Sequence, residues 1–490
     1  MALRRRLICT LIAGAARGAF GLVARGRSLG SHFSARRLAV SRGAANLYPP
    51  VMADSEYHAL DRAAVFERTD VDALVIPARQ TGEALKRLRA YLFNAPRVPN
   101  VVADGDSGAT KRLLLSRTFF DAAAEDVVPA TDRAWVENLL QSGAFSKTTH
   151  LVELAYDHFT VEEALRKLIP ANVEIPTAFE QAGHVVHLNL RPDALPWKRV
   201  IAEVILDKVQ RCRTVVNKID EISSVFRTYP LEVLAGDDDT KVELREADCN
   251  FEFDVRDVYW NSRLQEEHKR LIEAIARDAS HVVADATCGV GPFAVPLAAN
   301  LGVLTYANDL NPESMRWLKH NARLNRCGTR LIAGEPLCAR VFLRGLRSRG
   351  IHFTCALFNL PASGLDLLDA FRGVHFSTQP VVHCYCFAGA SRGRAAENAA
   401  AVVADVLSRA AAALGAALPP AANGGLPFPS PDVEAAVDVA SNSAQTTVRW
   451  VRNVAPNKDM YCLSFRLPVD CAALPTHAEA GESESKRPRL

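Results

Sequence analysis

Glycines and acidic residues follow two short apolar runs in the second half of the chain. The run 282–285 ends in Asp285 and leads into a loop with Gly289 and Gly291, and a second apolar run is followed by Asp309. Glycines permit backbone conformations and a close ligand approach that a Cβ atom would block. A carboxylate at the end of the second strand can accept both hydroxyls of an adenosine ribose. The pattern indicates an adenosine-containing cofactor on a Rossmann-like sheet, although the glycines alone could also form a purely structural turn.

Pro292 discriminates between two cofactors that this pattern could hold. A dinucleotide such as NAD needs backbone N–H groups at a helix N-terminus to bind its pyrophosphate. We expect Pro292 at the first position of a helix that ends near Gly302, where it lacks one of these donors. S-adenosylmethionine carries no phosphate. The acid Asp285 would attract its ammonium group, whereas it would repel a pyrophosphate. The sequence therefore favours S-adenosylmethionine.

A third apolar run, 355–358, is followed by Asn359 and Pro361. A side-chain amide can both donate hydrogen bonds to a purine edge and accept them from it. A lone Asn-x-Pro is common, but here it follows the two cofactor motifs at the expected tip of a fourth strand. The three motifs together indicate a methyltransferase that acts on a nitrogen, with RNA as one candidate substrate.

Alternating strands and helices from about residue 248 to 468 predict a parallel-sheet α/β domain. The chain has 490 residues, of which 49% are hydrophobic and 23% charged, and this composition excludes a wholly disordered or fibrous protein. Its 11 cysteines include no CxxC pair, so we expect free thiols in a reducing compartment. The longest uncharged run within the fold, 286–308, contains glycine and proline and predicts two short elements instead of a membrane span.

Charge is distributed unevenly along the chain. Residues 1–53 hold nine arginines and no acid, which leaves 49 basic and 55 acidic residues in the remainder, a balance of −6. A nucleic acid must therefore be held by a local basic patch. The densest one outside the leader is a cluster between residues 198 and 218, which is either an RNA-contact surface or a solvated face: Lys198, Arg199, Lys208, Arg211, Arg213 and Lys218.

The two ends of the chain have the composition of targeting segments. The arginine-rich, acid-free stretch 1–53 is typical of a mitochondrial transit peptide, although a basic arm that binds nucleic acid has similar composition. Met52 stands where acidic residues begin and could start a shorter form without the leader. The polar tail ends in the basic segment 486–490, which is either a weak nuclear signal or a solubilising tail. We expect location in the mitochondrial matrix, with nuclear and cytoplasmic pools.

Several long motifs resemble the eukaryotic and archaeal tRNA (guanine(37)-N1)-methyltransferases, and the resemblance covers roughly residues 56–468. It implies methyl transfer from S-adenosylmethionine to N1 of guanosine 37 in tRNA, next to the anticodon, where the modification supports reading-frame maintenance. We expect tRNA as the partner, no membrane association and no obligate protein partner, and therefore a monomer. The segments that carry the resemblance, in chain order, are 183–191, 259–264, 285–296, 307–314, 359–362, 381–387 and 451–460.

Combined with the patterns above, the resemblance predicts the fold class and the division of the chain. The fold class is α/β: a class I Rossmann-like S-adenosylmethionine methyltransferase domain preceded by smaller α+β RNA-binding domains. The expected divisions are a transit peptide over 1–53, an N-terminal domain over 54–145, a tRNA-binding middle domain over 146–247, the methyltransferase domain over 248–470 and a disordered tail over 471–490.

The resemblance also implies roles for individual residues. Guanine N1 must lose a proton as the methyl group arrives, and Glu267 matches the family's general base. Arg227 matches a guanidinium that stabilises charge on guanine O6. The remaining matches are substrate contacts at Tyr259, Arg263 and Pro361, cofactor contacts at His268, Asp309, Leu310, Cys338 and Ala339, and Asn359, which orients the base and also contacts the cofactor. No metal is needed, because the sulfonium is already an activated donor.

The sequence departs from the family pattern at one of these positions. Cys338 stands where the family usually has an aspartate that contacts adenine. Either Glu335 replaces that aspartate from one turn earlier, or backbone groups hold the adenine.

Other functions remain open at the level of sequence. Ser391 lies in a G-x-S-x-G segment, as a hydrolase nucleophile would, but the only suitable histidine, His477, lies in the polar tail. Alternation along the strand places His383 on the opposite face from Cys384 and Cys386, which argues against a metal site. A non-catalytic RNA-binding protein and a transferase that moves the cofactor's aminocarboxypropyl group are the closer alternatives.

Overall fold

The computed structural model describes residues 57–473, apart from 107, 117–118, 121–127, 178, 220–225, 227–229, 278–279, 390–395 and 422–445. The transit peptide, Met52, residues 474–490 of the tail, Arg227 and Ser391 lie outside the described residues, and so do the predictions that rest on them. The predicted start of a disordered tail at residue 471 is wrong, because Cys471 is buried in the core of the methyltransferase domain within a short helix, Val469–Ala473. Within the described part, no helix is long and apolar enough to cross a membrane.

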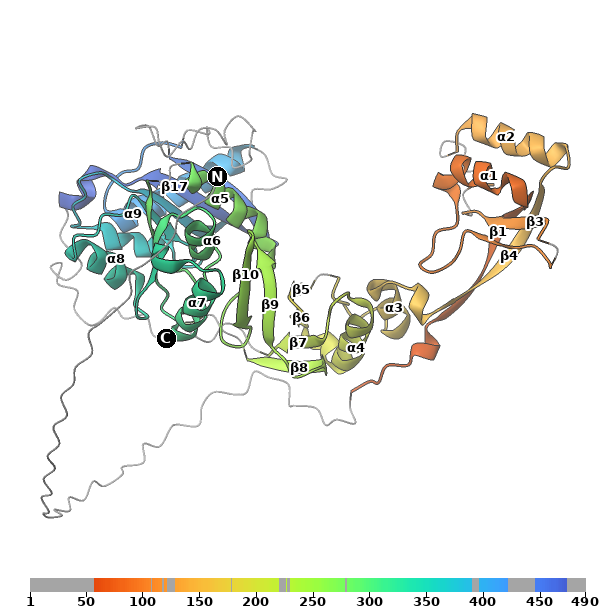
Figure 1. Cartoon of the computed structure of the whole chain (residues 1–490), viewed down its shortest axis with the longest axis horizontal. Helices are drawn as coiled ribbons and strands as arrows, with labels where there is room; N and C mark the ends of the chain where they lie inside the picture. Colours follow the sequence, from red (N-terminus) through yellow and green to blue (C-terminus); the bar gives the residue numbers. More distant parts are fainter. Residues whose placement is uncertain are drawn as a thin grey trace, which may run out of the picture. The chain divides into compact units, whose positions relative to one another are not determined.

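The first sheet is antiparallel and has the strand order β2-β3-β1-β4. Its strands are β1 (Phe66–Pro77), β2 (Val101–Ala103), β3 (Thr110–Leu114) and β4 (Ser146–Ala155), and α1 (Thr81–Arg87) and α2 (Ala130–Gln141) pack against it (Figure 1). The predicted domain boundary at residues 145 and 146 is wrong, because β4 pairs with β1 from Phe66 to Val75 and therefore belongs to this sheet.

The second sheet has the order β5-β6-β7-β8, and its central pair is parallel. The strands are β5 (Glu180–Ala182), β6 (Val185–Leu188), β7 (Thr214–Lys218) and β8 (Leu231–Gly236); α3 (Val161–Leu168) precedes them and α4 (Lys198–Lys208) joins β6 to β7. Ile201 and Ile205 of α4 are fully buried against Val215 of β7. This sheet, together with α3 and α4, forms the middle domain.

A hairpin follows, formed by β9 (Lys241–Glu246) and β10 (Cys249–Asp254). The predicted boundary at residues 247 and 248 falls within its turn, where Ala247 and Asp248 both have left-handed φ angles of 47° and 59°. Phe251 and Phe253 pack in one core with Met315 and Leu318 of the methyltransferase domain, so the hairpin cannot be divided there.

The third sheet has the order β13-β12-β11-β14-β15-β17-β16, with the first five strands parallel and β17 antiparallel to both neighbours. It confirms the predicted class I α/β domain, and the strand order reverses between β11 and β14, where open α/β sheets bind ligands. Its strands are β11 (Val282–Asp285), β12 (Leu304–Ala307), β13 (Leu331–Ala333), β14 (Cys355–Phe358), β15 (Val381–Gly389), β16 (Thr447–Ala455) and β17 (Lys458–Arg466).

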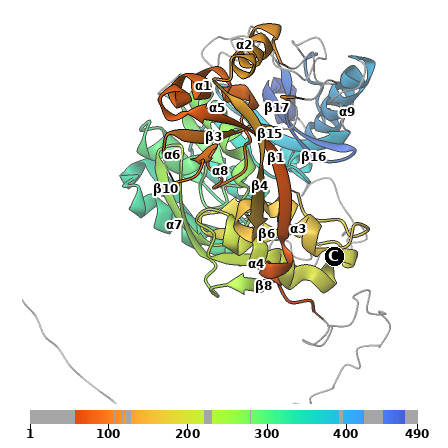
Figure 2. The ribbon, with the colours of Figure 1, turned by 90° about the vertical axis from the view of Figure 1, so that its right-hand side faces the viewer.

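Helices cover both faces of this sheet, because its strands alternate apolar residues between the faces. One core joins β-strand residues such as Val283 and Leu357 to α5 and α6, and a second joins Ala284 and Phe358 to α8 and α9. Figure 2 shows α6 and α7 at one flank of the domain and α9 at the other. The helices are α5 (Gln265–Ala276), α6 (Ala294–Ala299), α7 (Pro312–Leu324), α8 (Ala339–Ser348) and α9 (Ala396–Leu414).

The structure corrects the expected start of α6. Pro292 lies in the turn before the helix, which begins at Ala294 and ends at Ala299 instead of near Gly302. Pro292 nevertheless withholds a backbone N–H donor from the loop, so the argument against a pyrophosphate is unaffected.

Candidate active site

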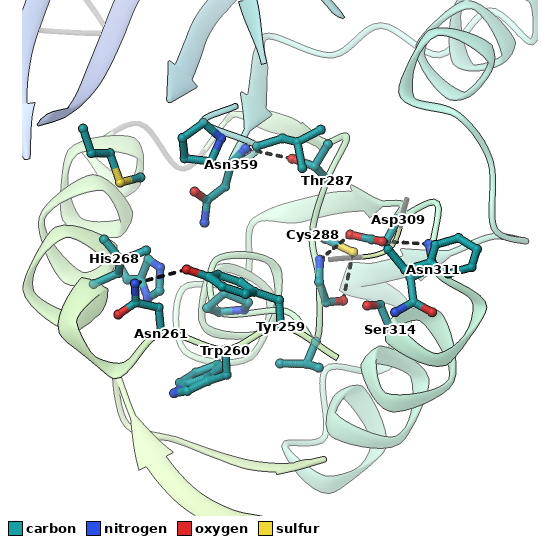
Figure 3. A pocket seen from close by; sticks show the side chains of 18 of the residues that line it. Tyr259, Trp260, Asn261, His268, Thr287, Cys288, Asp309, Asn311, Ser314 and Asn359 are labelled. Carbon is teal, nitrogen blue, oxygen red and sulfur yellow. Dashed lines mark hydrogen bonds between the residues drawn. The ribbon is translucent and has the colours of Figure 1, made fainter. Parts of the chain in front are cut away.

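A cavity opens at the carboxyl ends of β11, β12 and β14, where the sequence motifs were expected to meet (Figure 3). Its wall is completed by residues before and within α5 and by β15, β16 and β17. The side chains and loops that line it include Thr287, Cys288, Gly289 and Val290 after β11, Asp309, Leu310 and Asn311 after β12, Asn359, Leu360 and Pro361 after β14, and Tyr259, Trp260, Asn261, His268, Phe387, Arg452 and Met460.

The loop after β11 is held by backbone hydrogen bonds and by two left-handed glycines. Gly289 has a φ of +54°, and its N–H donates to Asp309 Oδ2 at 2.9 Å. Gly291 has a φ of +102°, and a Cβ atom there would lie 2.6 Å from Cγ2 of Val295. Larger residues would therefore be strained at both positions, and at Gly291 they would also clash. The loop offers a fixed backbone surface to a ligand.

Asp309 is fixed at the tip of β12 by two backbone donors. Its Oδ2 accepts from Gly289 and its Oδ1 accepts from the N–H of Asn311 at 2.9 Å. A carboxylate has roughly four acceptor positions, so each oxygen retains capacity for another donor. The geometry fits the expected contact with ribose hydroxyls.

Asp285 is a fully buried carboxyl group at the end of β11, and it is not among the residues that line the cavity. Neither oxygen accepts a hydrogen bond of normal geometry, and burial, then the charge of Asp309, raises the pKa of Asp285 to about 8, which the backbone at Thr287 only partly offsets. A buried carboxyl without a partner stabilises a cationic group placed beside it. The loop, in which Pro292 withholds an N–H donor, fits S-adenosylmethionine, which has no phosphate. The expected contact between Asp285 and the ammonium group stays a prediction.

Asn359 and Pro361 lie at the tip of β14, as predicted. The N–H of Asn359 donates to Thr287 Oγ1 at 2.8 Å, and the side-chain amide points into the cavity in Figure 3. The carbonyl of Pro361 accepts from the N–H of Phe387 at 3.0 Å, which fixes this loop to β15. The backbone at Asn359 is thus held at a defined position, and its side-chain amide faces the cavity.

His268 and Tyr259 also line the cavity, from opposite ends of the segment that enters α5. His268 is 4% exposed, and its Nδ1 lies 2.5 Å from Oε1 of the equally buried Glu246. The imidazole ring packs edge-on against Phe293. Tyr259 is 42% exposed, and its hydroxyl accepts from Asn261 Nδ2 at 3.2 Å.

Glu267 is buried and paired, and it does not line the cavity. Arg270 holds both carboxylate oxygens at 2.6 and 2.7 Å, the hydroxyl of Tyr385 donates to Oε1 at 2.9 Å, and Arg449 Nε lies 3.7 Å from Oε2. The free base expected at this position is therefore corrected: in this structure the carboxylate is occupied by cations. Its catalytic role stays a prediction.

The paired carboxylate is nevertheless close to the cavity wall. Tyr385 and Phe387 point to the same face of β15, because they are two residues apart. Phe387 and its cross-strand neighbour Met460 line the cavity. Tyr385, which binds Glu267, lies about 7 Å further along the strand. Glu267 is thus one row of side chains behind the wall.

Three other predicted site residues lie away from the cavity lining. Cys338 is the N-cap of α8 and Ala339 its first residue, and neither is among the lining residues. Arg263 is exposed and donates to the carbonyl of Phe179 at 3.3 Å. Glu335, the expected substitute for the missing aspartate, has an 86% exposed side chain and pairs with Lys319, so it does not reach the cavity.

Leu310, by contrast, lines the cavity with 45% of its surface exposed. Phe226 also lines it, next in sequence to Arg227, which the structure does not describe. Sequence reasoning assigned no role to Asn261, Thr287 or Arg452. The only available signal was that each lies within or beside a motif already singled out.

The basic cluster between residues 198 and 218, here called the middle-domain basic cluster, is largely paired within the protein. Lys198 is 8% exposed and lies 2.5 Å from Glu232. Lys208 donates to the carbonyls of Tyr156 and Phe159 at 2.7 and 2.8 Å. At least these two cations hold the domain together, and contact between RNA and the rest of the cluster stays a prediction.

His383, Cys384 and Cys386 of β15 make contacts within the protein core. His383 bonds to Ser464, while Cys384 and Cys386 pack in the opposite core, and no disulfide joins these cysteines. Among the described residues, no group of three or more histidine, cysteine, aspartate or glutamate side chains could hold a metal ion.

The fold and this cavity define a class I S-adenosylmethionine-dependent methyltransferase. The "TRM5/TYW2 methyltransferase domain" family matches residues 242–389, and the "TYW2 N-terminal domain" family matches 161–240.

Curated relatives identify the family. The tRNA (guanine(37)-N(1))-methyltransferase of Phytophthora infestans is 39% identical over 440 residues, covering 88% of this chain and 97% of the relative. The enzyme of the same name from Danio rerio is 35% identical, covering 84% and 81%. The chain belongs to the tRNA (guanine(37)-N(1))-methyltransferases. The crystal structure of Trm5b from Pyrococcus abyssi has the same fold, with a TM-score of 0.52 at 20% identity, covering 81% of this chain and 99% of that one.

Proposed function

We propose that this protein transfers a methyl group from S-adenosylmethionine to N1 of guanosine 37 in tRNA. The observation that carries the proposal is that Asn359, Asp309 and the glycine loop face one cavity at adjacent strand tips, in a chain that belongs to this family. When bound, S-adenosylmethionine supplies a methyl group activated by a sulfonium.

The protein's own residues account for binding and orientation. Asp309 lines the cavity and can accept from ribose hydroxyls, and the loop of Gly289 lines the same cavity. The amide of Asn359 can donate to guanine O6 and accept from a ring or amino N–H. Single-stranded loops such as the anticodon loop expose base edges to contacts of this kind.

Proton removal from guanine N1 requires a base near the amide. Glu267 matches the family's base, and it lies one row of side chains behind the cavity wall. Arg270 and Arg449 occupy the carboxylate oxygens, so Glu267 must exchange at least one of these contacts before an oxygen can face guanine N1. We propose that substrate binding brings about this exchange.

The test is methyl incorporation into unmodified tRNA transcripts. Transcripts with guanosine 37 should be methylated, transcripts with another base at position 37 should not, and Asn359→Ala should lower the rate by about 10²-fold or more while tRNA binding is retained. Cofactor labelled in the amino-acid chain should leave the RNA unlabelled. Label transfer from that chain would instead show aminocarboxypropyl transfer.

We also propose that residues 1–53 direct the protein to the mitochondrial matrix, that nuclear and cytoplasmic pools arise from a start at Met52, and that the enzyme acts as a monomer. The arginine-rich, acid-free composition of this segment supports the first point. A reporter fused to residues 1–53 should enter mitochondria. Cytosolic protein should begin at or next to Met52, and only processed leader products there would contradict the second start.

A further inference from the structure

The cavity has a charged rim on the side away from the cofactor-binding loop. Asn261 lies across the cavity from Asp309 (Figure 3). Its Oδ1 accepts from Arg452 Nη1 at 3.2 Å and from the backbone N–H of Arg263 at 3.1 Å. Arg452 also lines the cavity, so β16 contributes a guanidinium to this rim.

An acid from the middle domain faces this rim. Glu180 of β5 accepts from the N–H of Ser262 at 3.0 Å, which joins the middle domain to the segment that enters α5. Burial raises the pKa of Glu180, while the charges of Lys218, Arg263 and Arg452 oppose that rise. Three cations therefore act on one carboxylate.

The cations of this rim are partly buried, and the charge of Arg263 acts unfavourably on both Arg452 and Lys218. Burial and then the charge of Arg263 lower the pKa of Arg452. Burial also lowers the pKa of Lys218, with Arg263 adding to the effect and Glu180 opposing it. Burial lowers the pKa of the neighbouring His187 to about 4, so His187 is neutral and adds no charge. Cations that repel one another in a partly buried site are stabilised by an anion.

The position of the rim indicates which anion it binds. The rim is separate from the residues placed for ribose and ammonium, it is shared by two domains, and Arg263 is exposed to solvent. A nucleotide whose base enters the cavity brings a phosphodiester group to the opening. Guanidinium groups bind phosphate oxygens in a two-pronged geometry, and an ammonium group adds a point charge.

We propose that Arg452, with the neighbouring Arg263, binds a phosphodiester group of the nucleotide whose base occupies the cavity, with Asn261 and Glu180 as positioning residues. The proposal rests on the proposed function and deepens it, because it assigns the RNA backbone a binding site at the cavity.

The test is a double-substitution cycle between the protein and the RNA. One transcript is unmodified, and two others each carry an uncharged methylphosphonate, one at the phosphate before guanosine 37 and one at the phosphate after it. Each transcript is assayed with wild type and with Arg452→Ala. Either change alone should lower kcat/KM by about 10- to 100-fold. For the transcript whose modified phosphate is the one that Arg452 binds, the two changes together should lower kcat/KM by no more than the larger single change does. Fully multiplicative losses with both modified transcripts would overturn the proposal.

Control variants separate this site from the cofactor site and from misfolding. Arg452→Lys should retain part of the activity, and Arg349→Ala, which removes one exposed arginine at the end of α8, should match wild type. Affinity for S-adenosylhomocysteine, measured by calorimetry, should stay within about twofold in Arg452→Ala. A tenfold loss of that affinity with unchanged tRNA binding would assign the rim to the cofactor's carboxylate and overturn the proposal.

Failure of the proposed function would be distinguishable. If wild type does not methylate the unmodified transcript, the function is wrong, and filter binding of the same combinations of transcript and protein still measures the phosphate contact. If wild type methylates guanosine 37 but the cycle is multiplicative, only the phosphate site is wrong.

Discussion

Two groups of basic side chains occupy this protein, and they differ in how their charge is balanced. In the middle-domain basic cluster, Lys198 pairs with Glu232, Arg213 with Asp239, and Lys208 with two backbone carbonyls. At the cavity rim, three cations act on one carboxylate. Lys218 belongs to both groups, since it ends β7 and its charge acts on Glu180. The proposed phosphate site rests on this difference, because cations that repel one another in a partly buried site attract an anion, whereas paired cations hold the domain together.

Glu267 offers the most stringent test of this difference, because it is fully paired and yet matches a catalytic base. Glu267→Gln should lower single-turnover methyl transfer by about 10³-fold, since an amide cannot take the proton from guanine N1. It should also lower the free energy of unfolding by roughly 3–5 kcal/mol, because Arg270 and Arg449 lose their shared acid. Rapid-quench kinetics and denaturant titration measure the two effects.

Tyr385→Phe is the matched control, because it removes only a hydrogen bond to the same carboxylate. It should reduce stability by about 1–3 kcal/mol and transfer much less than Glu267→Gln does, at a temperature where both variants are folded. If both variants lose methyl transfer in proportion to their loss of stability, Glu267 stabilises the fold and does not act as the base. Paired charges would then have the same stabilising role at the active site as in the middle domain.

Asp309→Ala should produce the next largest effect, on the cofactor side of the cavity. The change removes a charged acceptor and also releases the N–H groups of Gly289 and Asn311. Affinity for S-adenosylhomocysteine should fall by about 10- to 100-fold, as expected for hydrogen bonds to a charged group. Calorimetry measures the affinity and filter binding the tRNA control. Weakened tRNA binding with unchanged cofactor affinity would place Asp309 on the substrate side.

The strand-tip motifs could be predicted from sequence because they are local. Asp285, Asp309 and Asn359 each follow a short apolar run, and parallel strands bring their tips to one edge. Charge pairing could not be predicted, because Lys208 bonds to Tyr156, 52 residues away, and Glu267 to Tyr385, 118 residues away.

Two further failures have physical causes. The first domain boundary was misplaced because the partner of β4 is β1, far upstream, and a single strand carries no sign of its distant partner. Likewise, nothing local in the sequence shows that Arg452 of β16 reaches Asn261, 191 residues earlier in the chain.

Asp285 extends the comparison to a buried carboxyl group that burial keeps protonated well above its usual pKa. Its pKa is raised from 3.8 to about 8 in the folded state, by burial and by Asp309, so the folded protein holds a proton that the unfolded chain releases near pH 4. The associated stability is complete below the unfolded pKa and is lost as the pH rises toward 8. Asp285→Asn has no such proton, so its stability relative to wild type should increase between pH 5 and 8 and then level off.

Thermal denaturation of wild type and Asp285→Asn across this pH range measures the difference. A constant offset between the two proteins would show that Asp285 titrates normally. Asp309→Asn is the matched control, since it removes the negative charge that adds to the effect of burial on Asp285 and should reduce the wild-type pH dependence without abolishing it.

The middle-domain basic cluster, apart from Lys218, should give the smallest effects on RNA binding. Lys208→Met should lower the free energy of unfolding by about 1–3 kcal/mol, because the carbonyls of Tyr156 and Phe159 lose their donor. Arg211→Ala and Arg213→Ala, at exposed positions, should change stability by no more than about 0.5 kcal/mol. None of the three should change the slope of log tRNA affinity against log salt concentration by as much as one phosphate contact, whereas Arg452→Ala should. The comparison would fail if the first three variants lost as much slope as Arg452→Ala does. The cations of the middle-domain basic cluster and those of the cavity rim would then bind RNA alike.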